Sequence, residues 1–325
     1  MEIQKILFET VRNKINPNIR LVDAIGDILN IGYDSTYRRL RGEKELTISE
    51  LVKLCSHFNL SVDAILHHES NNALFKYSRL DLSDMDNYEA YMNEVATLYE
   101  GLIKASSKEI LLTALDIPIF HFASFLELSL FKLYAWNQSV YDGSITYDKF
   151  ISKLDIGNCM SIYRRVMDAY RQIPSTEIWT DYTIDPILQL IEYHFDMNCF
   201  ESKDNPGLLC HQLLQLIENL ERWTEKGSKE YRGKDTSFKL CLSSVDLGNN
   251  YIITKRDDNA VTSVKLFTIN AIFTSNAGFC EETEKWIRNI ISKSQVLSGV
   301  SARERFRFFQ SQKTKINNLM GKFEK

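Results

Sequence analysis

Residues 25–42 read IGDILNIGYDSTYRRLRG, and this stretch decides the fold of the N-terminal part of the chain. The apolar residues of its first half recur at helical spacing and predict one short helix with a buried stripe: Ile25, Ile28 and Leu29. The sequence Asn-Ile-Gly at 30–32 is typical of a tight turn. Gly26 is small enough for a second helix to pass close to the first. The stretch therefore predicts two helices joined by a turn.

The second helix carries short polar side chains and arginines. Asp34 or Ser35 can cap its N-terminus, and Tyr37 and Leu40 lie three residues apart and are expected to face inward. This register leaves four residues on the outward side or at its edges: Ser35, Thr36, Arg38 and Arg39. Arginine suits base recognition because its planar group donates to both acceptors of guanine at once. We expect these residues to lie against base edges in the major groove of DNA.

The residues after this helix predict how the small domain continues. Gly42 is expected to end the helix. Arg41 and Lys44 follow at positions where contacts with phosphates would orient the domain on DNA. Thr47 and Glu50 form the capping-box pattern T-x-x-E, which predicts the start of a third helix.

Residues 21–66 resemble the lambda-repressor-like helix-turn-helix family, in the Xre group of bacterial regulators. A short helix, a recognition helix ending in Arg-Gly, a loop and LxxLCxxFNLSVDAIL at 51–66 carry the resemblance. It implies binding to double-stranded DNA, usually as a homodimer on a pseudo-palindromic site. The turn at 30–34 is one residue longer than in the family, and Leu40 replaces a common acidic residue. The family pattern therefore does not decide which of the four outward residues contact bases.

The bulk properties of the chain limit where DNA can bind. The chain has 325 residues, enough for a small domain and a larger one. Its formal net charge is −4, so a DNA-binding surface must be a local cluster of cations. The six scattered cysteines suit a reducing compartment. Neither a signal-peptide pattern nor a membrane-spanning stretch is found, so we expect a cytoplasmic protein without a membrane partner.

A polar segment at 67–72, HHESNN, is the expected domain boundary. Residues 1–70 are expected to form an all-α helix-turn-helix domain. Residues 73–325 are expected to form a larger mixed α/β domain, with helices around about five strands. Its strands are expected at 109–115, at 176–183 and in a three-stranded antiparallel meander over 237–268.

The larger domain lacks the common nucleotide-binding and hydrolase motifs GxGxxG, GxxxxGK[ST] and GxSxG. We therefore expect neither an enzyme nor a cofactor. Asp116 and His121 follow a predicted strand, where ligand-site residues often project, although a structural hydrogen bond is the commoner role. The spacing of Cys199, Cys210 and His211 matches no standard zinc motif, so no metal site is expected.

Two hypotheses stay open for the whole chain. In the first it is a sequence-specific transcriptional regulator, in which residues 1–70 read DNA and residues 73–325 sense a small-molecule effector or dimerise. In the second, residues 73–325 are an enzymatic or protein-interaction module, and the helix-turn-helix is a tether, as in phage or toxin–antitoxin repressors. Four tryptophans could line an apolar ligand pocket, but aromatic residues are more often plain core: Trp136, Trp179, Trp223 and Trp286.

Overall fold

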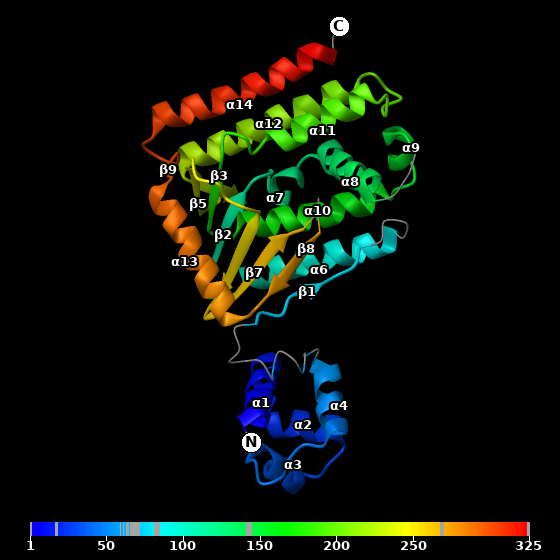
Figure 1. Ribbon diagram of the computed structural model, residues 1–325, viewed down its shortest axis with the longest axis vertical. Coiled ribbons are helices and arrows are strands. Elements are labelled where there is room, and N and C mark those ends of the chain that lie inside the picture. The colour runs from blue at the N-terminus through cyan, green and yellow to red at the C-terminus, as the bar shows by residue number, and fades with distance from the viewer. Residues whose placement is uncertain are drawn as a thin grey trace. The chain divides into compact units, whose positions relative to one another are not determined.

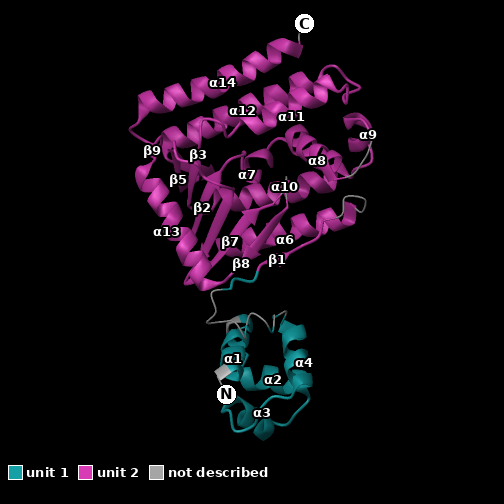
Figure 2. Cartoon of the chain, in the orientation of Figure 1, with its two compact units in different colours: residues 1–74 teal, residues 75–325 magenta. Residues whose placement is uncertain are grey.

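The computed structural model describes residues 2–16, 19–58, 60, 62, 65, 72–80, 85–140, 145–266 and 270–323. The chain divides into two compact units, residues 1–74 and 75–325, and each is described by itself (Figure 1; Figure 2). Residues 67–71 of the expected domain boundary lie outside the described residues.

Four helices pack around one apolar core in the described part of unit 1. They are α1 (Glu2–Lys14), α2 (Leu21–Leu29), α3 (Tyr33–Leu40) and α4 (Ile48–Phe58). The fully buried core residues Leu7, Ile25 and Leu54 come from α1, α2 and α4. Asn30 ends α2 in a left-handed conformation, with φ 54°, and the chain enters α3 three residues later. The two predicted helices and the turn between them are present.

Two local features of unit 1 confirm the sequence analysis. A Cβ atom at Gly26 would lie 3.3 Å from Oγ1 of Thr36, so the absence of a side chain lets α3 pack close to α2. At the start of α4, the backbone nitrogen of Glu50 donates to Oγ1 of Thr47 at 3.2 Å. In return, the backbone nitrogen of Thr47 donates to Oε2 of Glu50 at 2.9 Å. This reciprocal pair is the predicted capping box.

Unit 2 is an α/β fold with one mixed sheet, which has nine strands in the described residues. The strands are β1 (Lys76–Tyr77), β2 (Lys108–Ala114), β3 (Ser175–Trp179), β4 (Ser228–Tyr231), β5 (Lys234–Leu242), β6 (Tyr251–Arg256), β7 (Asn259–Lys265), β8 (Ala271–Thr274) and β9 (Gln295–Val296). Their order is β1-β8-β7-β6-β2-β3-β5-β4, with β9 beside β5. β2, β3 and β5 run parallel, whereas β6, β7, β8 and β1 continue the sheet on the other side of β2 as antiparallel neighbours.

Helices cover both faces of this sheet (Figure 1). They are α6 (Met85–Ile103), α7 (Ile119–Phe122), α8 (Leu126–Val140), α9 (Tyr147–Ile151), α10 (Ile156–Arg171), α11 (Asp185–Asp196), α12 (Asn205–Lys226), α13 (Ala277–Lys293) and α14 (Ala302–Phe323). Leu111 of β2 packs with Ile287 of α13, whereas its neighbour Leu112 belongs to the larger core with α6, α8 and α10. Because both faces of β2 are covered, its sequence is a continuous apolar run rather than an alternation.

The predicted α/β class and the strands at 109–115 and 176–183 are confirmed, although β3 already ends at Trp179. The expected number of about five strands was too low, because four short strands were not predicted: β1 and β9, with two residues each, and β4 and β8, with four residues each. The predicted three-stranded meander over 237–268 was wrong in one strand. β5 pairs with β3 instead of β6, and β8 takes the third place after β6 and β7. Alternating apolar residues identify a strand but not its neighbour, which depends on the path of the chain between strands.

None of the helices in the described ranges combines the length and the apolar composition that crossing a lipid bilayer requires.

Candidate functional site

The exposed surface of α3 and of the loop that follows it is the candidate DNA-binding surface. We define this α3 surface by its exposed residues: Tyr33, Asp34, Tyr37, Arg38, Arg41 and Lys44. The rings of Tyr33 and Tyr37 are 5.2 Å apart and both stay exposed. The guanidinium of Arg38 makes no hydrogen bond or ion pair with the described residues, so its donors are free to bind another molecule.

Two of the predicted base-contacting residues are buried. Thr36 is 0% exposed and Arg39 is 4% exposed, so the expectation that they face outward was wrong. Ser35 is half-buried, and Arg38 is exposed as expected. α3 already begins at Tyr33, before the expected caps Asp34 and Ser35, and its inward face is formed by Thr36 and Arg39, so that Tyr37 lies outward instead of inward. The two residues expected to contact phosphates, Arg41 and Lys44, are both exposed.

Arg39 joins α3 to α4. Its Nη2 donates to Oε1 of Glu50 at 2.6 Å, its Nε lies 3.3 Å from Oε2, and its Nη1 donates to the carbonyl of Ser35 at 3.0 Å. The hydrogen bond from Arg39 is the main reason why the pKa of the Glu50 carboxyl is below its ordinary value. The planar group that suits guanine is thus used inside unit 1, and Arg39 has a structural role.

Gln4 of α1 fixes the end of α3 and the loop behind it. Its Nε2 donates to the carbonyls of Arg39 and Lys44 at 2.8 and 2.9 Å, and its Oε1 accepts from the backbone nitrogen of Leu46 at 3.0 Å. These contacts hold the exposed cations of the loop on a defined backbone. No local pattern in the sequence indicates this role, because the partners are separated by 35 or more positions.

The charge of the α3 surface is only weakly positive. Arg38, Arg41 and Lys44 are cations, but Asp34 lies in the first turn of α3, and Nε of Arg41 is 3.1 Å from a carboxylate oxygen of Glu43. The three cations and the one carboxylate of the α3 surface leave two positive charges, which the neighbouring exposed carboxylates of Glu43 and Glu45 offset. Since phosphate contacts dominate non-specific affinity for DNA, a surface with so little net charge would bind DNA non-specifically only weakly.

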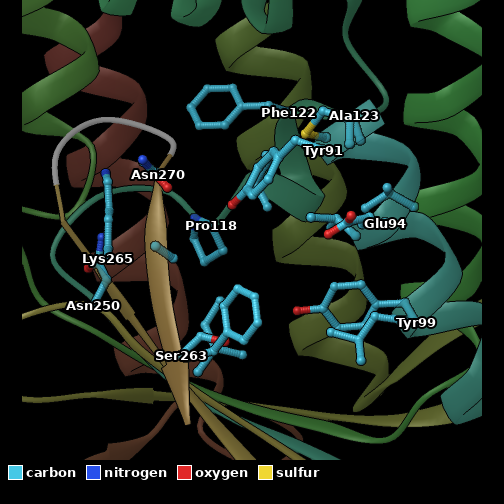
Figure 3. Close-up of a pocket in the computed structure, with 18 of the residues that line it drawn as sticks. Tyr91, Glu94, Tyr99, Pro118, Phe122, Ala123, Asn250, Ser263, Lys265 and Asn270 are labelled. Atoms are coloured by element: carbon cyan, nitrogen blue, oxygen red, sulfur yellow. The ribbon is translucent and has the colours of Figure 1, made fainter. Parts of the chain in front are cut away.

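Unit 2 contains a pocket of about 760 Å³ between α6 and the antiparallel half of the sheet (Figure 3). One row of residues across five strands forms its floor. Leu112 pairs with Ile252, Ile252 with Ser263, Ser263 with Phe273, and Phe273 with Lys76. All five line the pocket. Residues that are paired across a sheet face the same side, so this floor follows directly from the strand register.

Helix α6 forms the opposite wall of the pocket. Tyr91, Val95 and Tyr99 lie at helical spacing and line it, and burial raises the pKa of the Tyr91 and Tyr99 hydroxyls. Figure 3 shows Tyr91, Glu94 and Tyr99 on one side of the pocket, and Asn250, Lys265 and Asn270 on the other. Most of the lining is apolar, and the side chains of Asn250, Lys265 and Asn270 form a polar end.

A cluster of one carboxylate and two ammonium groups lies at this polar end. Oδ2 of Asp116 accepts from Nζ of Lys132 at 2.7 Å and from Nζ of Lys265 at 2.8 Å. Burial opposes the charged form of Asp116, but the two lysines still hold its pKa below the ordinary value. Burial also lowers the pKa of Lys265, although Asp116 acts in the opposite direction. Asp116, singled out in the sequence, therefore belongs to this pocket.

His121, the other residue singled out after β2, belongs to a different cluster. Its Nε2 lies 2.9 Å from Oε1 of Glu177, which also accepts from the hydroxyl of Tyr170, and Nε1 of Trp179 donates to the other carboxylate oxygen at 2.7 Å. His121 and Glu177 are 3% and 0% exposed and do not line the pocket. His121 therefore makes a structural hydrogen bond, the commoner role of a polar residue at such a position.

The other candidates from the sequence do not form a site. Trp136 and Trp179 are fully buried in the core, and none of the four tryptophans lines the pocket. Cys210 of α12 is buried in the core, and Cys199 is half-buried. Within the described ranges, no three His, Cys, Asp or Glu side chains gather as possible metal ligands.

Comparison of the chain with models of known protein families, with curated proteins and with solved structures gives no match, so the assignment of a function depends on the geometry of the α3 surface and of the pocket.

Proposed function

We propose that the chain is a sequence-specific, DNA-binding transcriptional regulator, in which unit 1 is a helix-turn-helix domain and unit 2 senses a small-molecule effector. The observation that carries the proposal is the contrast between two adjacent arginines. Arg39 is buried and paired with Glu50, whereas Arg38 is exposed on the same short helix and has no partner among the described residues. α3 is thus anchored through one arginine and presents the other to a ligand.

In this proposal α3 enters the major groove as the recognition helix. Arg38 donates to the two acceptors of a guanine, and Tyr37 and Ser35 lie beside it. Arg41 and Lys44 contact phosphates on either side of the groove and orient the domain. One such domain buries little surface on DNA, so the protein binds as a homodimer on two half-sites.

Unit 2 supplies the signal in this proposal. Its pocket of about 760 Å³ has the size and the largely apolar lining that are typical of small-molecule sites. The charged groups of Asp116, Lys132 and Lys265 at one end can orient a ligand. We assign this pocket to an effector rather than to a substrate, because the chain carries none of the common catalytic motifs.

Selection from a random DNA library with the full chain tests the proposal. We expect the wild type to enrich one motif with two related half-sites, and Arg38→Ala to bind that motif about tenfold more weakly or worse. Arg12→Ala is the matched control, since Arg12 is exposed on α1 and lies eight residues, about 12 Å, beyond Gln4. A wild type that enriches no motif, or an Arg38→Ala variant that binds as well as the control, would contradict the proposal.

A further inference from the structure

We propose that the pocket of unit 2 binds a hydroxylated apolar carboxylate, with the carboxylate at Lys132 and Lys265 and the apolar body between α6 and the sheet. Binding itself is independent of the proposed function, and only the role of this ligand as the effector rests on it.

The lining of the pocket suits an apolar body. Leu112, Ile252 and Phe273 form the floor, and Tyr91 and Val95 form the wall that faces it. These side chains offer no charge to a ligand. The polar end lies just beyond the carboxyl end of β2, where the parallel half of the sheet meets the antiparallel half. Ligands of open α/β sheets commonly bind beyond the carboxyl ends of strands at such a change of direction.

The charge of the polar end calls for an anion. Lys132 and Lys265 bring two positive charges to the single carboxylate of Asp116. Each ammonium has three N–H donors, and the described residues accept from only one of each. A bound carboxylate can accept from the remaining donors and removes the uncompensated charge. Burial lowers the pKa of Lys265 more than Asp116 raises it. A second anion would therefore stabilise the charged form of this lysine.

Two buried acceptors show where a hydroxyl belongs. Oδ1 of Asp116 and Oδ1 of Asn270 have no hydrogen-bond partner among the described residues. The two side chains are 8% and 1% exposed, and both line the pocket. A buried acceptor without a donor is unfavourable, so each is a position at which a ligand can donate. A hydroxyl near the carboxylate can donate its one hydrogen to either of these acceptors, whereas an amino group would place a further cation beside two lysines.

The ligand therefore has a defined direction in the pocket. Its carboxylate and hydroxyl lie on the side of Lys265 and Asn270, and its apolar chain runs toward Tyr99 and Glu94 on the other side (Figure 3). The exposed pair of Lys76 and Glu94, 3.9 Å apart, also lines the pocket, and half or more of each side chain is accessible there. We infer that ligands enter past this pair.

Calorimetric titration of the purified full chain, without DNA, tests the proposal with decanoate, 3-hydroxydecanoate and decanol as probes. We expect 3-hydroxydecanoate to bind more tightly than decanoate, and decanoate about tenfold more tightly than decanol. Lys265→Met should remove the preference for decanoate over decanol, and Lys265→Arg should keep it. Lys255→Met is the matched control, since Lys255 also lies 2.8 Å from a carboxylate, that of Glu284, but does not line the pocket.

Two further variants separate the two halves of the ligand. Ser263→Phe fills the floor and should abolish binding of all three probes, and Asn270→Ala should reduce the preference for 3-hydroxydecanoate alone. Equal binding of decanoate and decanol by the wild type, or unchanged decanoate binding by Lys265→Met, overturns the proposal. No binding of any probe overturns it as well. Because DNA selection is done without these probes, failure of either experiment leaves the other result intact.

Discussion

Nη2 of Arg39 lies 2.6 Å from Oε1 of Glu50 and ties the helix of the α3 surface to α4. The two side chains are 4% and 16% exposed, so solvent screens this ion pair only weakly. Arg38, the preceding residue, is exposed and has no such partner. Adjacent positions of one helix therefore differ in role: Arg39 stabilises the packing of α3 on α4, and Arg38 is available for the proposed contact with DNA.

Arg39→Ala is expected to destabilise unit 1 by about 3 kcal/mol, because it leaves the Glu50 carboxylate partly buried without its main partner. All four tryptophans lie in unit 2, so tryptophan fluorescence does not report on unit 1. The stability of unit 1 is measured instead by hydrogen exchange and mass spectrometry of peptides from residues 33–58, with peptides of unit 2 as an internal reference. Arg38→Ala is the control and should change the stability by less than about 0.5 kcal/mol. Equal protection in both variants would show that the ion pair contributes nothing.

The same pair predicts a dependence of stability on pH. The hydrogen bond from Arg39 lowers the pKa of Glu50 below its ordinary value of 4.5. The stabilisation is therefore complete above pH 4.5 and is lost as the pH falls through the lower pKa of the folded state. We expect protection of residues 33–58 to fall more steeply in the wild type than in Glu50→Gln over this range. Parallel pH profiles of the two proteins would exclude Glu50 as the titrating group.

Gly26→Val is expected to destabilise unit 1 by about 2 kcal/mol, because larger side chains strain a packed contact. The first added carbon already lies 3.3 Å from Oγ1 of Thr36 and 3.4 Å from the carbonyl of Ile31, and valine adds two more. Gly32→Val is the comparison for loss of glycine itself, since a Cβ there meets nothing within 4 Å. Hydrogen exchange of unit 1 measures both. If the two variants lose the same stability, the close approach of α2 and α3 is not the cause.

The α3 surface shows how far the sequence could predict the site. Local signals were sufficient to predict the helices: the spacing of Ile25, Ile28 and Leu29 for α2, and the capping box of Thr47 and Glu50 for α4. The orientation of α3 could not be predicted: Tyr37 was expected to face inward, but Thr36 and Arg39 do so. The local sequence does not distinguish an exposed arginine such as Arg38 from one that pairs with a distant glutamate, such as Arg39.

The pocket of unit 2 could not be predicted at all. Its floor depends on which strand lies beside which, and the sequence placed β5 next to β6. Lys132 and Lys265 are separated from Asp116 by 16 and 149 positions, so no spacing pattern connects them. Only Asp116 could be predicted as a possible ligand-site residue, because it follows an apolar strand. Long-range pairing, rather than side-chain type, was the missing information.

The salt dependence of DNA binding distinguishes phosphate contacts from base contacts on the α3 surface. If Arg41 and Lys44 contact phosphates, alanine at either position should weaken binding to all sequences equally and reduce the slope of log K against log salt by about one. Asp34→Asn should strengthen binding to all sequences, because it removes a carboxylate beside the phosphates. Filter binding to specific and random duplexes over a series of salt concentrations measures the slopes. A change in motif preference with Arg41→Ala would instead assign this residue to the bases.

The buried cluster of His121 and Glu177 predicts a large structural effect without an effect on the pocket. Burial alone would raise the pKa of Glu177, but His121 and the other donors hold it below the ordinary value, so the carboxylate is charged. His121→Leu removes one donor and should cost about 3–5 kcal/mol. The double variant His121→Leu with Glu177→Leu should cost less than the sum of the single changes, because it removes the unpaired charge as well. Urea unfolding monitored by tryptophan fluorescence, which reports on unit 2, gives the three free energies. Additive losses would mean that the histidine and the carboxylate stabilise the fold independently.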